Sequence, residues 1–352
     1  MLRSVIIAAV VNVFLPVNDA LSLNMTKNLK VVVSSNNYPE SGLQILREHF
    51  TVIKSPNTHF GEEGAVNNME LLKYVPGASA LVWITHYPIT KELLDAAGPQ
   101  LKMVATVSAG YNHCNVPELK ARGIKLANTP NVLSSAVAEI AVGLIIGTAR
   151  RFTENLENVR RGEWILDFDK GLGQDIRGST VGIIGLGGIG QATVKRLSGF
   201  EVGKFLYTGH REKPEAKALN AEFTSLDNLL KQSDFVVLSV PLTDETRHMI
   251  NSTTLGKMKK NAILINVGRG DLVDQDALYE ALKNNDIYAA GLDVTTPEPL
   301  PKDHKLLSLP NLFVLPHIGS ATVRTRNDMA VLAANNVVNG LTGKPLITPV
   351  LP

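Results

Sequence analysis

The chain has 352 residues and a mass of 38.0 kDa, which is enough for two domains of ordinary size with buried cores. Its formal net charge is +2, so neither nucleic acid nor a membrane surface is expected as a partner. Cys114 is the single cysteine, which excludes an intrachain disulfide and argues against a cysteine-based zinc site. No metal is expected.

Residues 1–25 precede the first strand-like segment and allow two interpretations. An apolar run from Val5 to Val17 follows Arg3 and is shorter than a membrane span, so it resembles a secretory signal or an organelle presequence. Alternatively, translation starts at Met25 and gives a cytosolic protein. We expect a cytoplasmic protein and leave mitochondrial or secretory targeting by this extension open.

Strand-like and helix-like segments alternate through the first part of the chain. Strands are expected at 30–35, 80–85 and 102–108, and helices at 41–50, 91–98 and 116–123. Such alternation is typical of parallel βαβ units. A long helix is expected at 134–152; it is apolar nearly all round, so it must be buried between domains or subunits.

A second alternating series follows that helix. Six strands are expected, at 180–185, 204–209, 235–240, 262–267, 289–294 and 312–317. Their continuous apolar runs are typical of a parallel sheet covered on both faces. A last helix is expected at about 325–340, where it could fold back onto the first domain. The sequence therefore predicts an α/β protein with parallel sheets.

The segment VGIIGLGGIGQAT (181–193) carries the spacing Gly185-x-Gly187-x-x-Gly190 between a strand and a helix. In this context Gly185 allows a tight turn, Gly187 lets the backbone approach a pyrophosphate, and Gly190 lets the helix pack on the strand. Backbone N–H groups and the helix dipole then hold the phosphate charge. An incidental glycine-rich turn is the alternative. The motif lies mid-chain, so the nucleotide-binding domain is inserted into a domain that begins before it.

A dinucleotide site usually has an acidic residue about 20 positions further on, where it binds the ribose of NAD. Here Thr208 takes that position, and His210, Arg211 and Lys213 follow, with Glu212 between the last two. A carboxylate would repel a 2′-phosphate, whereas a guanidinium can bind one with two hydrogen bonds. NADPH is therefore the expected cofactor, with NADH left open. The alternative is that Arg211 and Lys213 are ordinary solvated charges.

Four polar residues follow the later strands: Arg269, Asp293, Glu298 and His317. Ligands of doubly wound sheets bind beyond the carboxyl ends of the strands, so these side chains are expected in one crevice. The set suits hydride transfer to a 2-keto acid. Arg269 would fix the carboxylate and carbonyl oxygen, His317 would give the alkoxide its proton, and Glu298 would stabilise the imidazolium. Taken singly, each residue has a purely structural interpretation.

Several long motifs occur in order, among them TVGIIGLGGIGQA, FLYTGHREKP, NVGRGDLVDQDALYEAL, GLDVTTPEPLP and LPHIGSATVRTRN. Through them, residues 28–345 resemble the D-isomer-specific 2-hydroxyacid dehydrogenase family, and most of all its glyoxylate- and hydroxypyruvate-reducing branch. The resemblance implies two Rossmann-like domains, with the substrate-binding domain built from 26–127 and 319–352 and the dinucleotide-binding domain from 128–318. It also implies a homodimer that pairs through the nucleotide-binding domain, which suits the apolar helix.

The resemblance assigns roles residue by residue. His317 would be the acid/base, Glu298 its partner and Arg269 the substrate anchor. The implied cofactor site comprises Gly185, Gly187, Gly188, Ile189, Gly190, Thr208, His210, Arg211, Pro241, Val267, Asp293 and Gly319, with Asp293 facing the nicotinamide carboxamide. The implied substrate site comprises Ala109, Gly110, Arg269, His317 and Ser320. The backbone amides of VSAGYNH (107–113) would receive the substrate carboxylate as an anion nest, the alternative being an ordinary tight turn.

The chain also departs from the family pattern. Gly188 stands where many relatives have Arg, Ser239-Val240-Pro241 replaces His-x-Pro, and Ala136-Val137 replaces a Thr-Thr pair. These differences concern cofactor affinity more than the reaction type.

The expected activity is the reduction of glyoxylate to glycolate and of hydroxypyruvate to D-glycerate. One alternative is another D-2-hydroxyacid dehydrogenase, of the short phosphoglycerate, 2-ketogluconate or D-lactate type, which would differ in first-domain loops such as 83–88. A second is a dinucleotide-sensing corepressor on the same scaffold. A third makes Cys114 a nucleophile beside His113, although a buried thiol is the commoner case.

Overall fold

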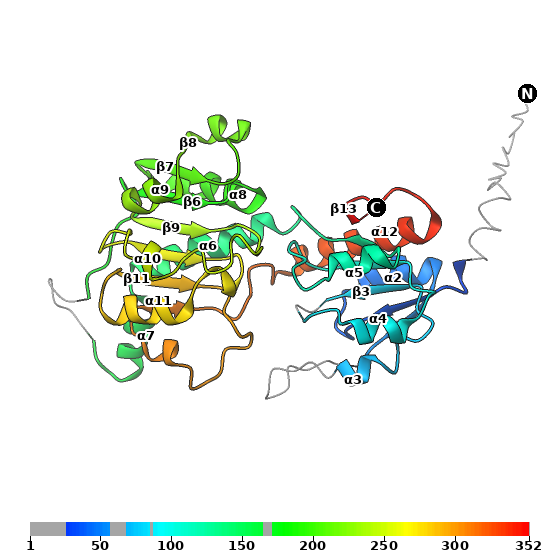
Figure 1. Ribbon diagram of the computed structural model, residues 1–352. Helices are drawn as coiled ribbons and strands as arrows, with labels where there is room; N and C mark the ends of the chain where they lie inside the picture. Colours follow the sequence, from blue (N-terminus) through cyan, green and yellow to red (C-terminus); the bar gives the residue numbers. More distant parts are fainter. Residues whose placement is uncertain (1–25, 57–67, 85–86, 165–170, 352) are drawn as a thin grey trace, which may run out of the picture.

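The computed structural model describes residues 26–56, 68–84, 87–164 and 171–351. Figure 1 shows two lobes, each built around one sheet, with the first and last described elements together in the same lobe. No helix in these ranges is both long and apolar enough to cross a membrane. The extension 1–25 and positions 85–86 of the loop 83–88 lie outside the described residues.

The sheet of the first lobe has six strands in the order β13-β5-β4-β3-β1-β2. The strands are β1 (Lys30–Val33), β2 (Thr51–Lys54), β3 (Ala80–Trp83), β4 (Met103–Thr106), β5 (Lys125–Ala127) and β13 (Pro349–Leu351). All neighbouring pairs are parallel except β13, which runs antiparallel to β5. The sequence did not predict β2, β5 or β13. Each is short, and β2 has no buried residue that would mark it.

Alternate residues along these strands face two different helix layers. Val31 and Val33 lie in the core that includes α2 (Glu40–His49) and α12 (Val323–Thr342). Val32 lies in the core on the other face, with α3 (Asn68–Leu71), α4 (Lys91–Ala97) and α5 (Val116–Ala121). The Tyr38 hydroxyl donates to the Ala330 carbonyl at 2.6 Å, so the last helix does fold back onto the first lobe.

The second sheet has seven strands in the order β12-β11-β10-β9-β6-β7-β8, and all its pairs are parallel. They are β6 (Thr180–Ile184), β7 (Lys204–Thr208), β8 (Ala221–Phe223), β9 (Phe235–Leu238), β10 (Ile263–Asn266), β11 (Ala289–Leu292) and β12 (Leu312–Val314). Six of these match the predicted strands. β8 was missed because it is a short edge strand with no buried residue.

Helices cover both faces of this sheet. One face packs against α6 (Ser134–Ala149) and α8 (Gly188–Leu197), and the other against α9 (Leu226–Gln232), α10 (Ser252–Leu255) and α11 (Gln275–Lys283). The remaining helical segments are α7 (Phe152–Arg160) and the 3-10 turns η1 (Ser198–Phe200), η2 (Pro214–Leu219), η3 (Gly270–Leu272) and η4 (Lys305–Ser308). The crossover helices explain why the strands are apolar on both faces.

The helix predicted over 134–152 corresponds to α6, which ends three residues earlier, at Ala149. Arg151 has a left-handed backbone with φ of 56°, and the helix α7 that begins after it was not predicted. Leu144 and Ile145 of α6 are fully buried against the second sheet, whereas Glu139 is exposed. The apolar composition of α6 therefore serves packing within its own lobe.

Candidate active site

The phosphate loop after β6 has the geometry that its glycines predict. Gly185 has φ of +99°, and a Cβ there would come within 2.6 Å of Val240 Cγ1. A Cβ at Gly190 would collide with the Gly185 carbonyl oxygen, which also accepts a hydrogen bond from Ser239 Oγ at 2.7 Å. Around Gly187, by contrast, a Cβ would meet no described atom within 4 Å. The open backbone at the start of α8 fits a pyrophosphate.

Gly188 lies against the start of α6. A Cβ at this position would be 2.7 Å from Ser134 Oγ and 2.9 Å from Asn131 Oδ1. Two polar side chains thus occupy the space into which an arginine at 188 would extend. The neighbouring Ile189 is half-buried and packs on the core.

The strand end that the cofactor's ribose would meet is much more open. Thr208 is paired with Ile184, and its carbonyl accepts from Gly185 N–H at 3.0 Å. His210 and Arg211 are exposed. The loop that carries them is fastened by the Lys213 N–H, which donates to the Tyr207 hydroxyl at 2.8 Å. The structure therefore places the predicted cations at the same edge as the phosphate loop, on a solvent-facing turn.

The other predicted cofactor residues lie along this edge as well. Val267 follows β10 and is 5% exposed, while Pro241 follows β9 and is exposed. Gly319 and Ser320 follow β12, and a Cβ at Gly319 would be 2.8 Å from Asp293 Oδ2. The parallel register of β9, β10, β11 and β12 brings these turns together.

Arg269 is held by a buried asparagine that sequence reasoning missed. Asn266 is 1% exposed; its Oδ1 accepts from Gly268 N–H at 3.0 Å and its Nδ2 donates to the Arg269 carbonyl at 2.8 Å. The available signal was a polar residue at the end of an otherwise apolar strand, since a buried amide is rarely left without partners. Burial lowers the pKa of Arg269, and the nearby Glu298 charge opposes that shift.

The guanidinium of Arg269 reaches from the second lobe to the first. Nη1 donates to the Gly268 carbonyl at 2.8 Å, and Nε donates to Asn112 Oδ1 at 3.0 Å. Nη2 lies over Gly110, where any Cβ would collide with it. The structure therefore brings the predicted substrate anchor directly onto the predicted anion nest.

The carbonyl groups of the predicted anion nest accept hydrogen bonds from side chains. Ser108 Oγ donates to the Gly110 carbonyl, and Asn128 Nδ2 donates to the Ala109 carbonyl, both at 2.6 Å. Among the described residues, the N–H groups of Ala109 and Gly110 have no hydrogen-bond acceptor. These amides are therefore suitable donors to a carboxylate.

His317 and Glu298 form a pair. Nδ1 of His317 lies 2.8 Å from Glu298 Oε2, and the other oxygen of Glu298 accepts from Thr295 N–H at 3.0 Å. The His317 backbone has φ of +54°, and its N–H donates to the Asp293 carbonyl at 2.8 Å. Both side chains are about a quarter exposed. The pair is thus held by its backbone hydrogen bonds and remains accessible to a ligand.

Asp293 holds the turn that carries His317. Its two oxygens accept from the N–H groups of Ile318 and Gly319, each at 2.8 Å, and the residue is 2% exposed. Burial raises the pKa of Asp293, while the two backbone hydrogen bonds and His317 oppose the rise. Asp293 thus fixes the turn that carries the histidine. Its contact with a nicotinamide carboxamide stays a prediction.

Tyr87 and Cys114 are two ionisable residues of the first lobe whose pKa values are shifted. Burial, and then the Glu298 charge, raise the pKa of Tyr87. Cys114 is 5% exposed, and burial raises the pKa of its thiol to about 12. A thiol of this kind is a poor nucleophile at neutral pH, which weakens the third sequence-based alternative.

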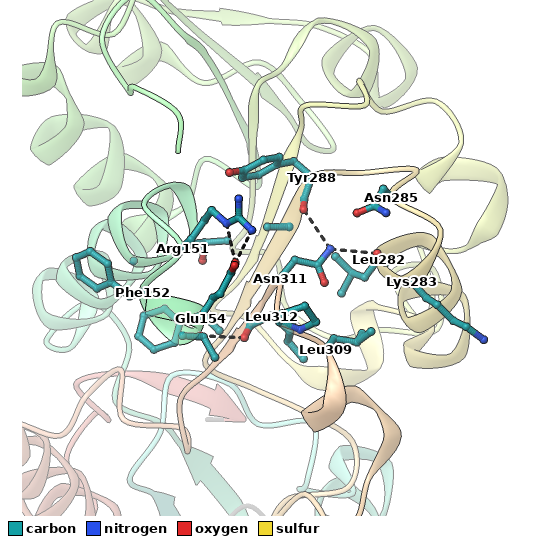
Figure 2. A pocket seen from close by; sticks show the side chains of 16 residues that line it. Arg151, Phe152, Glu154, Leu282, Lys283, Asn285, Tyr288, Leu309, Asn311 and Leu312 are labelled. Carbon is teal, nitrogen blue, oxygen red and sulfur yellow. Dashed lines mark hydrogen bonds and ion pairs between the residues drawn. The ribbon is translucent and has the colours of Figure 1, made fainter. Parts of the chain in front are cut away.

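A separate cavity of about 420 Å³ lies at the opposite end of the second sheet (Figure 2). Arg151 pairs with Glu154 on its wall at 2.5 Å, and Asn311 Nδ2 donates to the carbonyls of Leu282 and Tyr288. It lies at the amino ends of β11 and β12, whereas the residues described above follow their carboxyl ends. This cavity is therefore distinct from the candidate active site.

Comparison with known proteins agrees with the geometry. Residues 142–319 match a family described as D-isomer specific 2-hydroxyacid dehydrogenase, NAD binding domain. The chain is 49% identical to human glyoxylate reductase/hydroxypyruvate reductase over 279 residues, covering 79% of this chain and 85% of that protein. It is 46% identical to a glyoxylate reductase of Thermococcus kodakarensis over 306 residues, covering 85% and 90%.

A solved structure of similar fold is an NADPH-dependent glyoxylate/hydroxypyruvate reductase from Sinorhizobium meliloti in complex with NADP and malonate. It aligns with a TM-score of 0.76 and 32% identity, covering 92% of this chain and 96% of that one. A glyoxylate reductase from Paecilomyes thermophila aligns with a TM-score of 0.80 and 29% identity, covering 92% and 98%.

Proposed function

The chain belongs to the D-isomer specific 2-hydroxyacid dehydrogenase family, and on this premise we propose that it reduces glyoxylate to glycolate and hydroxypyruvate to D-glycerate, with NADPH preferred over NADH. Family membership makes it an oxidoreductase with an NAD(P)-binding domain. The observation that carries the proposal is the 2.8 Å His317–Glu298 pair on the same edge as Arg269 and the phosphate loop.

His317 acts as the general acid of this reaction. Glu298 pairs with Nδ1, and Nε2 gives a proton to the alkoxide oxygen as it forms. Because Glu298 is itself fixed by the Thr295 N–H, its carboxylate orients the imidazole and stabilises the imidazolium. In the reverse direction the same nitrogen accepts the proton of a 2-hydroxy acid.

Arg269, Ala109 and Gly110 hold the substrate. The Nη2 side of the guanidinium lies over Gly110, and the carbonyls of Ala109 and Gly110 are held by other hydrogen bonds, so their N–H groups are the donors proposed for the substrate. A carboxylate bound there receives charge-assisted hydrogen bonds from both, and its neighbouring carbonyl oxygen lies beside the same guanidinium. This accounts for a preference for 2-keto acids over simple ketones. Ser320 borders the substrate from the turn after His317.

The phosphate loop fits a dinucleotide, and such a cofactor, when bound, supplies the hydride. Gly185, Gly187 and Gly190 shape the loop, and the start of α8 holds the pyrophosphate. Two observations support a 2′-phosphate at the far end: no carboxylate ends β7, and Arg211 is exposed on the following turn. NADPH is therefore the preferred cofactor in this proposal.

The proposal includes a homodimer formed through the nucleotide-binding lobe. Phe152, Leu156 and Val159 of α7 are 44%, 54% and 53% exposed, and Leu307 of η4 is 48% exposed. Three of these four residues border the grooves beside α7 and η4. An apolar surface of this kind is typical of subunit contacts. Leu156→Glu should give a monomer in analytical ultracentrifugation, and an unchanged dimer would place the contact elsewhere.

A cytoplasmic location also belongs to the proposal. Fluorescent fusions of the full chain and of a chain starting at Met25 should show the same diffuse distribution. An organelle pattern for the full chain alone would assign the targeting role to residues 1–25.

The test of substrate class is a panel of 2-keto acids at equal concentrations with NADPH. Glyoxylate and hydroxypyruvate should give the highest kcat/KM, and D-glycerate should be the hydroxypyruvate product on a chiral column. Faster reduction of phosphohydroxypyruvate, 2-ketogluconate or pyruvate would reassign the enzyme within its family. Tight dinucleotide binding without turnover of any acid would favour a sensor.

A further inference from the structure

The segment Thr106–His113, from the end of β4 to the start of α5, contains an ordered chain of hydrogen bonds behind the anion nest. Thr106 Oγ1 lies 2.7 Å from Ser108 Oγ and 2.9 Å from His113 Nε2, and Ser108 Oγ donates to the Gly110 carbonyl at 2.6 Å. A carbonyl only accepts, so the Ser108 proton is used there. Thr106 must then donate to Ser108, and His113 Nε2 must donate to Thr106.

This chain assigns a single proton arrangement to the loop. His113 is 5% exposed, and burial, with the charge of Arg269, lowers its pKa to about 4. The imidazole is therefore neutral near pH 7, with its proton on Nε2. Each group has one compatible donor direction, so the hydrogen bonds link Thr106, Ser108, the Gly110 carbonyl and His113 in one arrangement.

Asn112 is carried by this loop and faces the other lobe. Its Oδ1 accepts from Arg269 Nε at 3.0 Å, although the residue is exposed and lies far from Arg269 in sequence. Nη1 of the same guanidinium donates to the Gly268 carbonyl. With Nε and Nη1 engaged, the guanidinium plane is fixed and its Nη2 side lies over Gly110, where a carboxylate would bind.

We propose that Asn112 is a positioning residue for the substrate anchor: it holds the Arg269 guanidinium across the cleft, in register with the anion nest, before substrate arrives. Holding a long cationic side chain in its binding geometry reduces the conformational entropy lost when the substrate binds. The inference rests on the proposed function, since it assigns Arg269 to the substrate carboxylate. In a competing role, Asn112 would block Arg269 Nε, and the substrate would have to displace it in order to bind.

These two roles predict opposite results. If Asn112 positions Arg269, Asn112→Leu should raise KM for hydroxypyruvate at least 5-fold while kcat changes less than 2-fold. Asn112→Gln keeps an uncharged amide oxygen as acceptor for Nε and should stay within 3-fold of wild type. Asn284→Leu makes the same change at an exposed position at the end of α11 and serves as the control. The NADPH Kd from fluorescence titration should match wild type in all three variants.

A double-mutant cycle shows whether Asn112 acts through Arg269. Arg269→Lys has no Nε donor, so adding Asn112→Leu should raise KM by less than 2-fold in that background. An equal rise in both backgrounds would mean that Asn112 acts by another route and would overturn the inference. So would a lowered or unchanged KM in Asn112→Leu, a loss confined to kcat, or a failure of Asn112→Gln to retain function. A wild-type protein that reduces no 2-keto acid would instead overturn the proposed function, and this inference with it.

Discussion

The two ends of the nucleotide crevice are built in different ways. At the end of β10, β11 and β12, Asp293 and Asn266 are almost fully buried, and their side chains hold the turns that carry His317 and Arg269. At the end of β7, His210 and Arg211 are exposed on a turn fastened by the Tyr207–Lys213 hydrogen bond.

The difference separates the chemistry from the choice of cofactor. Acid–base catalysis requires groups held within hydrogen-bonding distance of the reacting atoms, and a buried network supplies that geometry. The 2′-phosphate of NADPH needs only a suitably charged neighbour, which an exposed turn supplies. Substitutions at the buried end should therefore be costly for every substrate and cofactor, whereas those at the exposed end should be mild and selective.

The largest effect is expected for His317→Ala. Removing the general acid should lower kcat by about 10²–10⁴-fold with either cofactor, because the alkoxide loses its proton donor. Steady-state kinetics with hydroxypyruvate measures this directly, and the NADPH Kd from fluorescence should remain close to wild type. Unchanged turnover would remove His317 from the mechanism.

Arg269→Ala should come next, with kcat/KM for hydroxypyruvate lowered about 10²-fold, mainly through KM. The substrate carboxylate then loses its charged partner within a site that is partly desolvated. Arg324→Ala is a fitting control, because that side chain is 93% exposed on α12. If both variants bound substrate equally well, the anchor would have to be another residue.

His113, in the segment between β4 and α5 of the first lobe, allows a test through stability. Its pKa of about 4 in the folded protein is below the usual 6.5, so the unfolded chain binds more protons between these values. Stability therefore falls as pH falls from about 6.5 to 4, by an amount on the order of 2–3 kcal/mol. His113→Gln keeps a donor for Thr106 but cannot titrate.

Urea unfolding of the wild type and His113→Gln at several pH values measures this contribution. The variant should lose less stability than the wild type over that pH range. Parallel curves for the two proteins would show that His113 titrates normally in the folded state.

The smallest effect belongs to the exposed end. Arg211→Ala should lower kcat/KM for NADPH about 5- to 10-fold and leave the value for NADH nearly unchanged, because only NADPH carries the 2′-phosphate. Lys217→Ala, another exposed cation on η2, provides the comparison. Equal losses with both cofactors would mean that Arg211 supports the turn and does not recognise the phosphate.

Much of this arrangement was predictable from the sequence. Apolar runs gave the strands of the second sheet, and the parallel βαβ pattern placed the residues after each strand on one edge. The spacing of Gly185, Gly187 and Gly190 between a strand and a helix identified the phosphate loop. The end of α6 at Ala149 was missed by three residues, because no proline marks the left-handed Arg151.

The partners of the supporting side chains were not predicted, although the position of Asn266 at the end of an apolar strand marked it as a residue that needs them. Asn266 and Asn112 lie far apart in sequence, and both act on Arg269, one on its backbone and one on its side chain. Each asparagine lies in a motif whose neighbouring residues were assigned roles, but the asparagine itself was not. The direction of an amide side chain depends on packing between the lobes, which the sequence does not show. Short edge strands such as β8 and β13 were missed because they bury too little to leave a periodic signal.

The central claim is that a fixed acid–base end reduces 2-keto acids while an open, cationic end selects NADPH. Parallel steady-state reduction of hydroxypyruvate by NADPH and by NADH tests both halves at once. The account predicts turnover with each cofactor and a higher kcat/KM with NADPH. A clear preference for NADH would contradict the role given to Arg211 and the open strand end, and no turnover with either cofactor would contradict the reaction assigned to His317.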